Sequence, residues 1–248
     1  MAIVTGDLKL YQSANMPEAD GATSGGAIAT TGKAEIVDLS ATDTVEALSD
    51  GADVRTCTVT GRLASGAIDS EALVLTGATP VNGAKSFKDI LKVVMSGADG
   101  SRTVTVRKAS DDVTICTLGP NITSQRRLFY DSASDSDGTV RYEKLFWKNE
   151  HGTLSLTAAT LKLTADPEAD YKIGGAPSVD DSATVSDRLD TAPASVTFVD
   201  DNVAQAVPGD GNLDAGEAIG IWVQQTLAAS AAATDSSVTT ELAGTTAA

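Results

Sequence analysis

The chain has 248 residues, of which 42% are hydrophobic and only 4% aromatic, so it is long enough for one large or two small domains. Its 34 acidic and 18 basic residues give a formal net charge of -16, which argues against binding to nucleic acid phosphates or to an anionic membrane surface. We expect no signal peptide and no membrane span, because neither a basic segment followed by an apolar one nor a run of about 18 apolar residues is present.

Residues 1–50 predict a strand followed by an extended N-terminal arm. Alternating apolar residues before position 12 indicate the strand. The segment 13–33 is rich in glycine and contains Pro17, and its only large apolar residues are Met16 and Ile28. Such a segment cannot bury much apolar surface alone, so we expect it to lie extended along a neighbouring subunit.

Residues 51–120 predict a first β module. Alternation is clearest in 54–60, and further short strands are expected at 72–75, 103–106 and 113–118, separated by Gly- and Asp-containing turns. Segment 86–95 has apolar residues at helical spacing and then a strand-forming run, so we expect one helical turn that continues into a strand. Strands at this spacing are typical of a sandwich.

Residues 121–248 predict a second β-sandwich module. The stretch Val140–Leu163 is expected to form a strand, a turn, and two further strands joined by a short bend, and bulky side chains on both faces of the first strand suggest packing on both sides. Segment 218–227 is expected to pair with this first strand, which would bury Trp147 and Trp222 in neighbouring strands. Segment 166–191 is expected to be loop-rich and 203–216 to be a loop, and a strand at 238–242 closes the sheet.

The predicted fold class is therefore all-β, with antiparallel β-sandwich modules, immunoglobulin-like or jelly-roll-like, behind an extended N-terminal arm. Cys57 and Cys116 lie on two expected strands, at a separation that an immunoglobulin-like bridge could have. However, no Trp lies between them and Thr114, instead of Tyr, stands two residues before Cys116. We therefore expect two buried free thiols.

No catalytic residue and no cofactor is predicted. The only histidine, His151, lies in an expected turn without a nucleophile motif around it, so we expect the protein not to be an enzyme. The acidic loop 131–137 could hold a cation weakly or be simply solvated.

A weak candidate for a metal site is formed by Asp210, Asn212 and Asp214, which match the first three ligand positions of an EF-hand calcium loop. Ala215 stands where that loop needs Gly, and Ile221 stands where it needs a bidentate Glu. The pattern is compatible with a weak calcium site or with a plain acidic turn.

Three segments resemble a family of structural proteins from the virions of tailed bacteriophages. They are DLKLYQSANMPEADGATSGGAI at 7–28, YEKLFWKNEHGTLSLTAATLKL at 142–163 and DAGEAIGIWVQQTLAASAAATDSSVTTELAGTT at 214–246, about a third of the chain in all. The resemblance implies a particle component, made in the host cytoplasm and located in the virion, that has no enzymatic activity. It implies homo-oligomers and contacts with other virion proteins, such as major capsid or tail proteins.

The expected function is thus that of a capsid minor or decoration (cement) protein that acts through multimeric contacts. A tail-tube, neck or baseplate subunit is an alternative, because an acidic lumen would let DNA slide through without sticking. A receptor- or glycan-binding β module is a second alternative, although ten aromatic residues leave few for exposed binding platforms.

Overall fold

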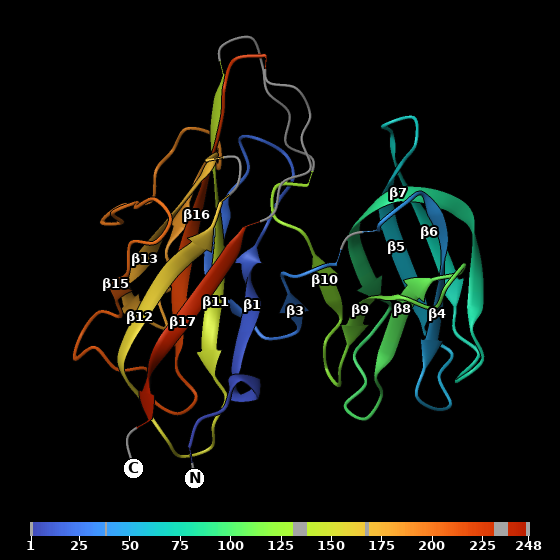
Figure 1. Ribbon diagram of the computed structural model, residues 1–248, viewed down its shortest axis with the longest axis horizontal. Coiled ribbons are helices and arrows are strands. Elements are labelled where there is room, and N and C mark those ends of the chain that lie inside the picture. The colour runs from blue at the N-terminus through green and yellow to red at the C-terminus, as the bar shows by residue number, and fades with distance from the viewer. Residues whose placement is uncertain (1, 38, 131–137, 167–168, 231–237, 247–248) are drawn as a thin grey trace. The chain divides into compact units, whose positions relative to one another are not determined.

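The computed structural model describes residues 2–37, 39–130, 138–166, 169–230 and 238–246, and these are built almost entirely of β-strands (Figure 1). The only helix within these ranges is a single 3-10 turn, η1 (Thr5–Asp7), and no helix there is long and apolar enough to cross a bilayer. The prediction of an all-β fold with antiparallel, sandwich-like sheets is confirmed. The chain forms two compact units: unit 1 contains Met1–Ala29 and Phe129–Ala248, and unit 2 contains Thr30–Leu128.

Unit 1 contains a six-stranded sheet in which β1 and β11 lie side by side although they are far apart in the sequence (Figure 1). Its strands, in spatial order, are β13 (Tyr171–Val179), β16 (Ala218–Leu227), β11 (Thr139–Asn149), β1 (Leu8–Asn15), β2 (Ser24–Ala29) and β14 (Thr184–Val185). All neighbours run antiparallel. The predicted pairing of 218–227 with the aromatic strand is confirmed, since Trp147 lies opposite Ile219 and Trp222 lies opposite Lys144.

A second sheet of unit 1 has three strands in the order β15, β12, β17. These are β15 (Gln205–Ala206), β12 (Leu156–Ala165) and β17 (Thr239–Thr246). The expected bend between two strands after Gly152 is an irregularity inside one continuous strand: the β12–β17 register shifts between Thr157 and Thr160, where Ala158 has a φ of 49°. A β-bulge, which is one extra residue in one of two paired strands, produces such a register shift and bends the strand locally.

Both faces of the six-stranded sheet are covered, as expected for its central strand. On one face, a Cβ built on Gly175 would lie 3.5 Å from Leu161 of the three-stranded sheet. On the other face, a Cβ on Gly174 would lie 2.3 Å from Val196, and Trp222 packs there with Tyr142 and Val185. Trp222 is fully buried as predicted, whereas Trp147 is only partly buried.

Unit 2 is organised around one 15-residue strand, β7 (Val81–Met95). Through its first half β7 pairs with β4, and through its second half it pairs with β5 on one side and β10 on the other. The remaining strands are β3 (Gly32–Lys33), β4 (Asp43–Ser49), β5 (Thr56–Leu63), β6 (Ile68–Val74), β8 (Val104–Lys108), β9 (Thr114–Leu118) and β10 (Ser124–Arg126). Phe87 lies where β4 and β5 both pair with β7, and a Cβ on Gly61 would meet its ring at 2.5 Å. Glycine at position 61 therefore makes room for the buried ring.

Three predictions about local structure are wrong. The helical turn expected in 86–95 is absent, because this segment pairs with partner strands throughout and the helical spacing of its apolar residues reflects register shifts along β5 and β4. Segment 166–191, expected to be loop-rich, contains the nine-residue β13 and also β14, and 203–216, expected to be a loop, contains β15. Glycine and proline in β13 lowered its apparent strand propensity.

The predicted boundaries, 1–50, 51–120 and 121–248, also differ from the structure. Residues 1–29 belong to the same unit as 129–248, because β1 completes its sheet beside β11. Residues 30–50 and 121–128 belong to unit 2 through β3, β4 and β10. Pairing between segments more than 100 residues apart leaves no trace in local sequence patterns.

The predicted extended N-terminal arm is replaced by ordered structure. β1 continues to Asn15, and residues 24–29 form β2 inside the six-stranded sheet. Gly25 and Gly26 have φ angles of 95° and 94°, which glycine adopts without strain. A Cβ on Gly25 would lie 2.6 Å from the indole ring of Trp222. Here glycine serves close packing, and the segment needs no neighbouring subunit to become ordered.

Candidate functional site

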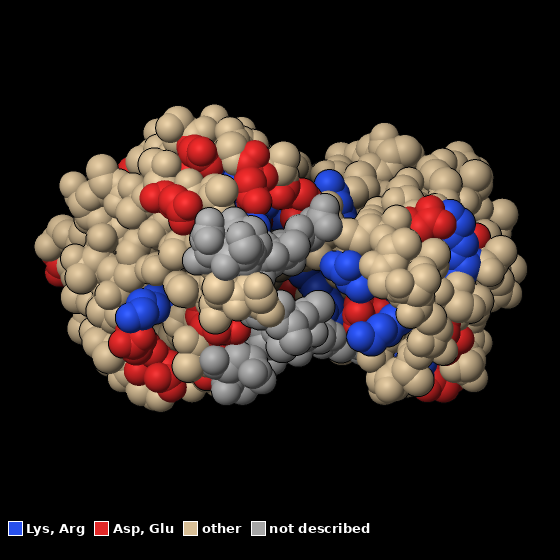
Figure 2. All heavy atoms as spheres, turned by 90° about the horizontal axis from the view of Figure 1, so that it is seen from above, with Lys and Arg blue, Asp and Glu red and all other residues tan. Residues whose placement is uncertain are grey.

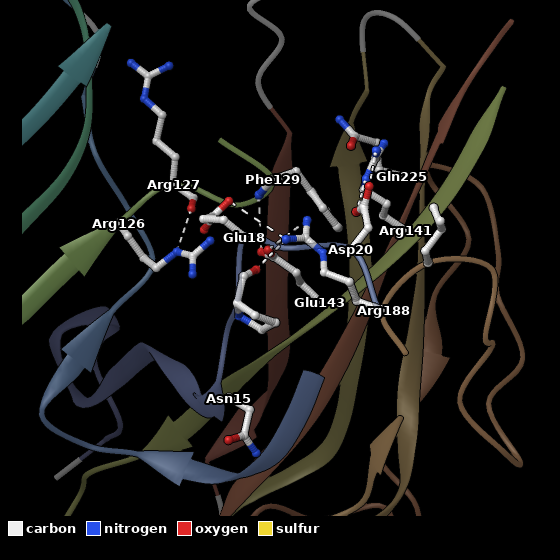
Figure 3. A network of polar contacts seen from close by, with 12 residues as sticks. Asn15, Glu18, Asp20, Arg126, Arg127, Phe129, Arg141, Glu143, Arg188 and Gln225 are labelled. Atoms are coloured by element: carbon white, nitrogen blue, oxygen red, sulfur yellow. Dashed lines mark hydrogen bonds and ion pairs between the residues drawn. The ribbon is translucent and has the colours of Figure 1, made fainter. Parts of the chain in front are cut away.

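The most concentrated polar chemistry among the described residues is a network of buried charges in unit 1, with Arg188 at its centre (Figure 3). Arg188 has no exposed surface. Its Nη2 lies 3.3 Å from Oε1 of Glu143, which is equally buried, and its Nη1 lies 3.8 Å from Oε2 of Glu18. The Nη1 group also donates a hydrogen bond to the carbonyl oxygen of Pro17. One guanidinium thus joins a central strand to the segment that follows β1.

Glu143, on β11, is oriented by a second donor. The backbone N–H of Phe129 donates to its Oε2 at 3.2 Å, and the guanidinium carbon of Arg188 lies 5.5 Å from the centre of the Phe129 ring. Both carboxylate oxygens therefore have partners although the side chain is fully buried. A buried ion pair needs this degree of satisfaction to offset the cost of removing two charges from solvent.

Arg141 binds the segment after β1 as well, through Asp20, which lies two residues after Glu18. Its Nε and Nη2 donate to the two carboxylate oxygens of Asp20 at 2.8 and 2.9 Å, and its Nη1 donates to Oγ1 of Thr139 at 2.7 Å. The hydrogen bonds from Arg141 hold the pKa of Asp20 below its usual value, although partial burial opposes this. A bidentate arginine–carboxylate pair fixes orientation as well as charge.

The network fastens the loop between β1 and β2 to the rest of unit 1. The backbone contributes as well: Arg188 N–H donates to the carbonyl of Ala22, and Gly21 N–H donates to the carboxylate of Asp187. Sequence reasoning did not identify Arg188, Glu143, Arg141 or Asp20. A strand-face argument could have singled out Arg141 and Glu143, which share a face of a strand buried on both sides, but their partners lie in distant segments.

Lys144 is a second buried charge, on the opposite face of β11. Its Nζ lies 2.5 Å from Oδ2 of Asp181 and donates to the carbonyl oxygens of Gly26, Asp181 and Ala183 at 3.0 to 3.3 Å. It also lies 4.8 Å from the ring centre of Phe146. Burial lowers the pKa of Lys144, and the nearby Asp181 carboxylate opposes that shift. This ammonium group holds the 181–183 turn and β2 against β11.

Unit 2 uses ion pairs in the same way. Arg55 donates from Nε and Nη2 to the carboxylate of Asp53 and from Nη1 to the carbonyl of Gly97. These bonds from Arg55 hold the pKa of the Asp53 carboxyl below its usual value. Glu46 on β4 accepts a hydrogen bond from Arg107 on β8, its direct cross-strand neighbour. Each pair ties a turn or a strand to its neighbour.

Both cysteines are buried, unbridged thiols in unit 2, as predicted. Burial raises the pKa of Cys57 to about 12 and raises the pKa of Cys116 as well. A thiol in such surroundings is a poor nucleophile and a poor metal ligand, because both roles require the thiolate.

The weak metal candidates Asp210, Asn212 and Asp214 lie in the loop between β15 and β16. The Asp210 carboxylate accepts hydrogen bonds from the backbone and side-chain amides of Asn212, and Asp214 N–H donates to Glu217. Within the described ranges, no group of three or more His, Cys, Asp or Glu side chains is placed to hold a metal ion. The arrangement is that of a turn stabilised by side-chain to backbone bonds.

His151 lies in the turn after β11, as predicted. Its Nδ1 accepts hydrogen bonds from the backbone N–H groups of Thr153 and Leu154, so the ring stabilises the turn. The other candidate for cation binding, the acidic loop 131–137, lies outside the described residues.

The net charge is divided unequally between the two units. Unit 1 contains 22 acidic and 7 basic residues, whereas unit 2 contains 12 acidic and 11 basic residues. All seven basic side chains of unit 1 make an ion pair within that unit. On the face shown in Figure 2, acidic side chains accordingly outnumber basic ones over unit 1. The surface of unit 1 is therefore strongly acidic, and unit 2 is close to neutral.

Comparison with known proteins does not add a relative, since no protein-family model, no curated protein and no solved structure matches this chain.

Proposed function

We propose that this protein is a structural component of a bacteriophage virion, a capsid minor or decoration protein that acts through contacts between subunits. One observation carries the proposal: the buried charged side chains of the described residues have partners within the chain, and most of them fasten strands and turns to one another. These side chains are Glu46, Asp53, Asp89, Lys108, Arg126, Arg141, Glu143, Lys144 and Arg188. Each of them makes a polar interaction within the chain.

A catalytic site would need a charged or nucleophilic group that a substrate can reach, with a geometry suited to the reaction. Here the buried charged groups, such as Arg188, Glu143 and Lys144, are paired with other groups of the chain and hold its strands and turns together. The two thiols are buried, and the only imidazole caps a turn. A rigid, acidic β protein suits a role in which shape and contact surfaces are the function. The resemblance of three segments to virion proteins points in the same direction.

The acidity of unit 1 favours a second candidate, a subunit of the tail tube, neck or baseplate. A surface with 22 acidic and 7 basic residues would repel DNA that passes along it. In that case unit 1 would face the lumen, whereas a decoration protein would expose unit 1 to solvent.

The test is immunogold electron microscopy of purified particles of the phage that encodes the chain, with an antibody against this protein, alongside mass spectrometry of the same particles. We expect the protein in the particles, with label over the capsid shell. Label confined to the tail would favour the second candidate. Absence of the protein from purified particles would overturn both, and binding on a glycan array would then favour a receptor-binding module.

A further inference from the structure

The outer edge of β17 is the feature of the fold that the proposed function leaves unexplained. β17 pairs only with β12, and β12 pairs on its other side with β15. Apart from bonds to β12, the one hydrogen bond to β17 among the described residues comes from the N–H of Ile3 to the side-chain Oγ1 of Thr246. With respect to the described residues, backbone groups along this eight-residue strand are therefore available on this side.

Among the described residues, the other sheet edges are either short or contacted by another segment. β3, β14 and β15 have two residues each. The outer side of β13 is covered at Ile173 by two backbone hydrogen bonds with Val199, and β9 receives the N–H of Val37. On β6, the backbone carbonyl of Ser70 accepts a hydrogen bond from Nζ of Lys85. Natural proteins protect edges in these ways. Among the described residues, β17 has no such contact apart from the bond from Ile3.

The residues of β17 suit pairing with another strand. Its sequence, TTELAGTT, is rich in threonine and contains no proline and no lysine. Its single charge, Glu241, already lies 3.9 Å from Lys162 on β12. Within the strongly acidic unit 1 this edge is thus a nearly neutral strip, where two copies of the chain can approach without bringing their acidic surfaces together.

We propose that β17 pairs antiparallel with β17 of a second copy of this chain, so that two three-stranded sheets join into one. Antiparallel pairing of identical strands has two-fold symmetry, and the same backbone groups then serve both copies. The inference rests on the proposed function, for which it supplies one contact between subunits. A strand from a different protein could use the same edge, but the neutrality of β17 within an acidic unit favours the second copy.

Strand geometry restricts the register. Leu242 is buried and faces the core, so Thr239, Glu241, Ala243 and Thr245 point to the other face of the sheet. Directly opposite residues share a face, and like charges directly opposite each other are destabilising. The favourable registers therefore set Glu241 opposite the partner's Ala243 or the partner's Thr245. In either register, a carboxylate at position 243 would lie opposite another carboxylate.

The experiment compares the wild-type chain with Ala243→Glu and with its neutral matched control Ala243→Gln. Sedimentation velocity over a range of concentrations measures dimerisation, and hydrogen exchange of residues 238–246 measures protection of β17. We expect dimers of the wild type and of Ala243→Gln, with β17 amides that become protected as the concentration rises. Ala243→Glu should weaken dimerisation by about tenfold and should remove this protection while unit 1 stays folded.

A chain that is monomeric at all concentrations would overturn the proposal. So would a dimer in which the protection of the β17 amides from hydrogen exchange does not change with concentration. So would equal dimerisation of Ala243→Glu and Ala243→Gln. Protection of β17 only inside purified particles would assign the edge to another virion protein. The proposed function fails separately: a monomer that is present in virions refutes only the β17 pair, whereas a β17 dimer that is absent from virions refutes only the virion role.

Discussion

At the scale of single residues, several side chains are determined by a buried neighbour. Gly25 is an example, because its missing side chain leaves space for Trp222, and its positive φ is a separate requirement. From the sequence alone, this glycine was assigned to an extended N-terminal arm. Composition shows how many glycines a segment contains, but the reason for each one depends on which distant side chain packs against it.

Replacement of Gly25 by Ala separates the two requirements when it is compared with Gly26→Ala. Both positions have φ near 95°, so both variants incur the left-handed backbone cost of about 1–2 kcal/mol. Gly25→Ala also brings Cβ to 2.6 Å from Trp222 and 2.8 Å from the carbonyl oxygen of Ala183. In Gly26→Ala the nearest atom is the side-chain amide nitrogen of Asn15 at 3.0 Å, and Ala14 and Thr184 lie at 3.4 Å or more. We expect urea denaturation to show the larger loss for Gly25→Ala. Equal losses would mean that the indole ring moves away without cost.

The buried thiols predict a defined chemical reactivity. Burial raises the pKa of Cys57 from 9.0 to about 12, so the folded state favours the neutral thiol. The corresponding contribution to the free energy of unfolding is fully present below pH 9 and is lost as the pH rises towards 12. At neutral pH we expect no reaction of native protein with Ellman's reagent and reaction of both thiols in urea. Val74→Cys, at a position that is 57% exposed on the same unit, is the control and should react in the native state. Rapid native labelling of Cys57 would contradict its burial.

At the scale of elements, the strands could be predicted better than their partners. Bulky residues on both faces identified the strand at 140–148 and its pairing with 218–227, and the structure confirms both. β2 was missed because its small residues show no alternation of apolar and polar side chains. β7 was partly misread because register shifts along a strand that pairs on several sides move apolar residues out of strict alternation.

The loop between β1 and β2 should depend on Arg188. Arg188→Met leaves the buried carboxylate of Glu143 without its guanidinium partner, and loss of one member of a buried pair costs about 3–5 kcal/mol. Lys172→Met, which removes an exposed pair with Asp200, is the matched control and should cost at most about 1 kcal/mol. With a protease that cleaves after glutamate, we expect cleavage at Glu18 in Arg188→Met and resistance in the wild type and the control. Cleavage of wild-type protein at Glu18 would show that the loop is not held as described.

At the scale of the whole molecule, unit 2 is an insertion within unit 1. Unit 1 takes its strands from residues before 30 and after 128, so its topology does not require residues 30–128. The sequence could not reveal this arrangement, because strand periodicity says nothing about which distant strand completes a sheet. The candidate site was hidden for the same reason: Arg188, Glu143 and Glu18 come from three separate parts of the chain.

The two units carry separate natural probes. Trp147 and Trp222 both lie in unit 1, and Cys57 and Cys116 both lie in unit 2. We expect tryptophan fluorescence and thiol labelling to report two unfolding transitions with different midpoints in urea. Coincident transitions by both probes, in the wild type and in variants of either unit, would instead indicate one cooperative unit.

Acid titration should also distinguish the units. The pKa of Asp53 in unit 2 and that of Asp20 in unit 1 are both lowered by an arginine partner. Their contributions to stability are present above about pH 4 and are lost as the pH falls below that value. Asp53→Asn should weaken the acid dependence of unfolding only where unfolding is followed by thiol labelling. Asp20→Asn should weaken it only where unfolding is followed by tryptophan fluorescence. A variant that changes both probes equally would argue against separate units.

The ends of unit 2 have a practical consequence. β3 and β10 run parallel and paired, and Thr123 donates its N–H to the carbonyl of Thr31, so the chain begins and finishes this unit at neighbouring points. A foreign folded domain whose own termini lie close together could be spliced between Ala29 and Phe129 in its place. Unit 1 would then act as a carrier for the inserted domain, and that domain could be exchanged as a cassette without rebuilding the rest of the protein.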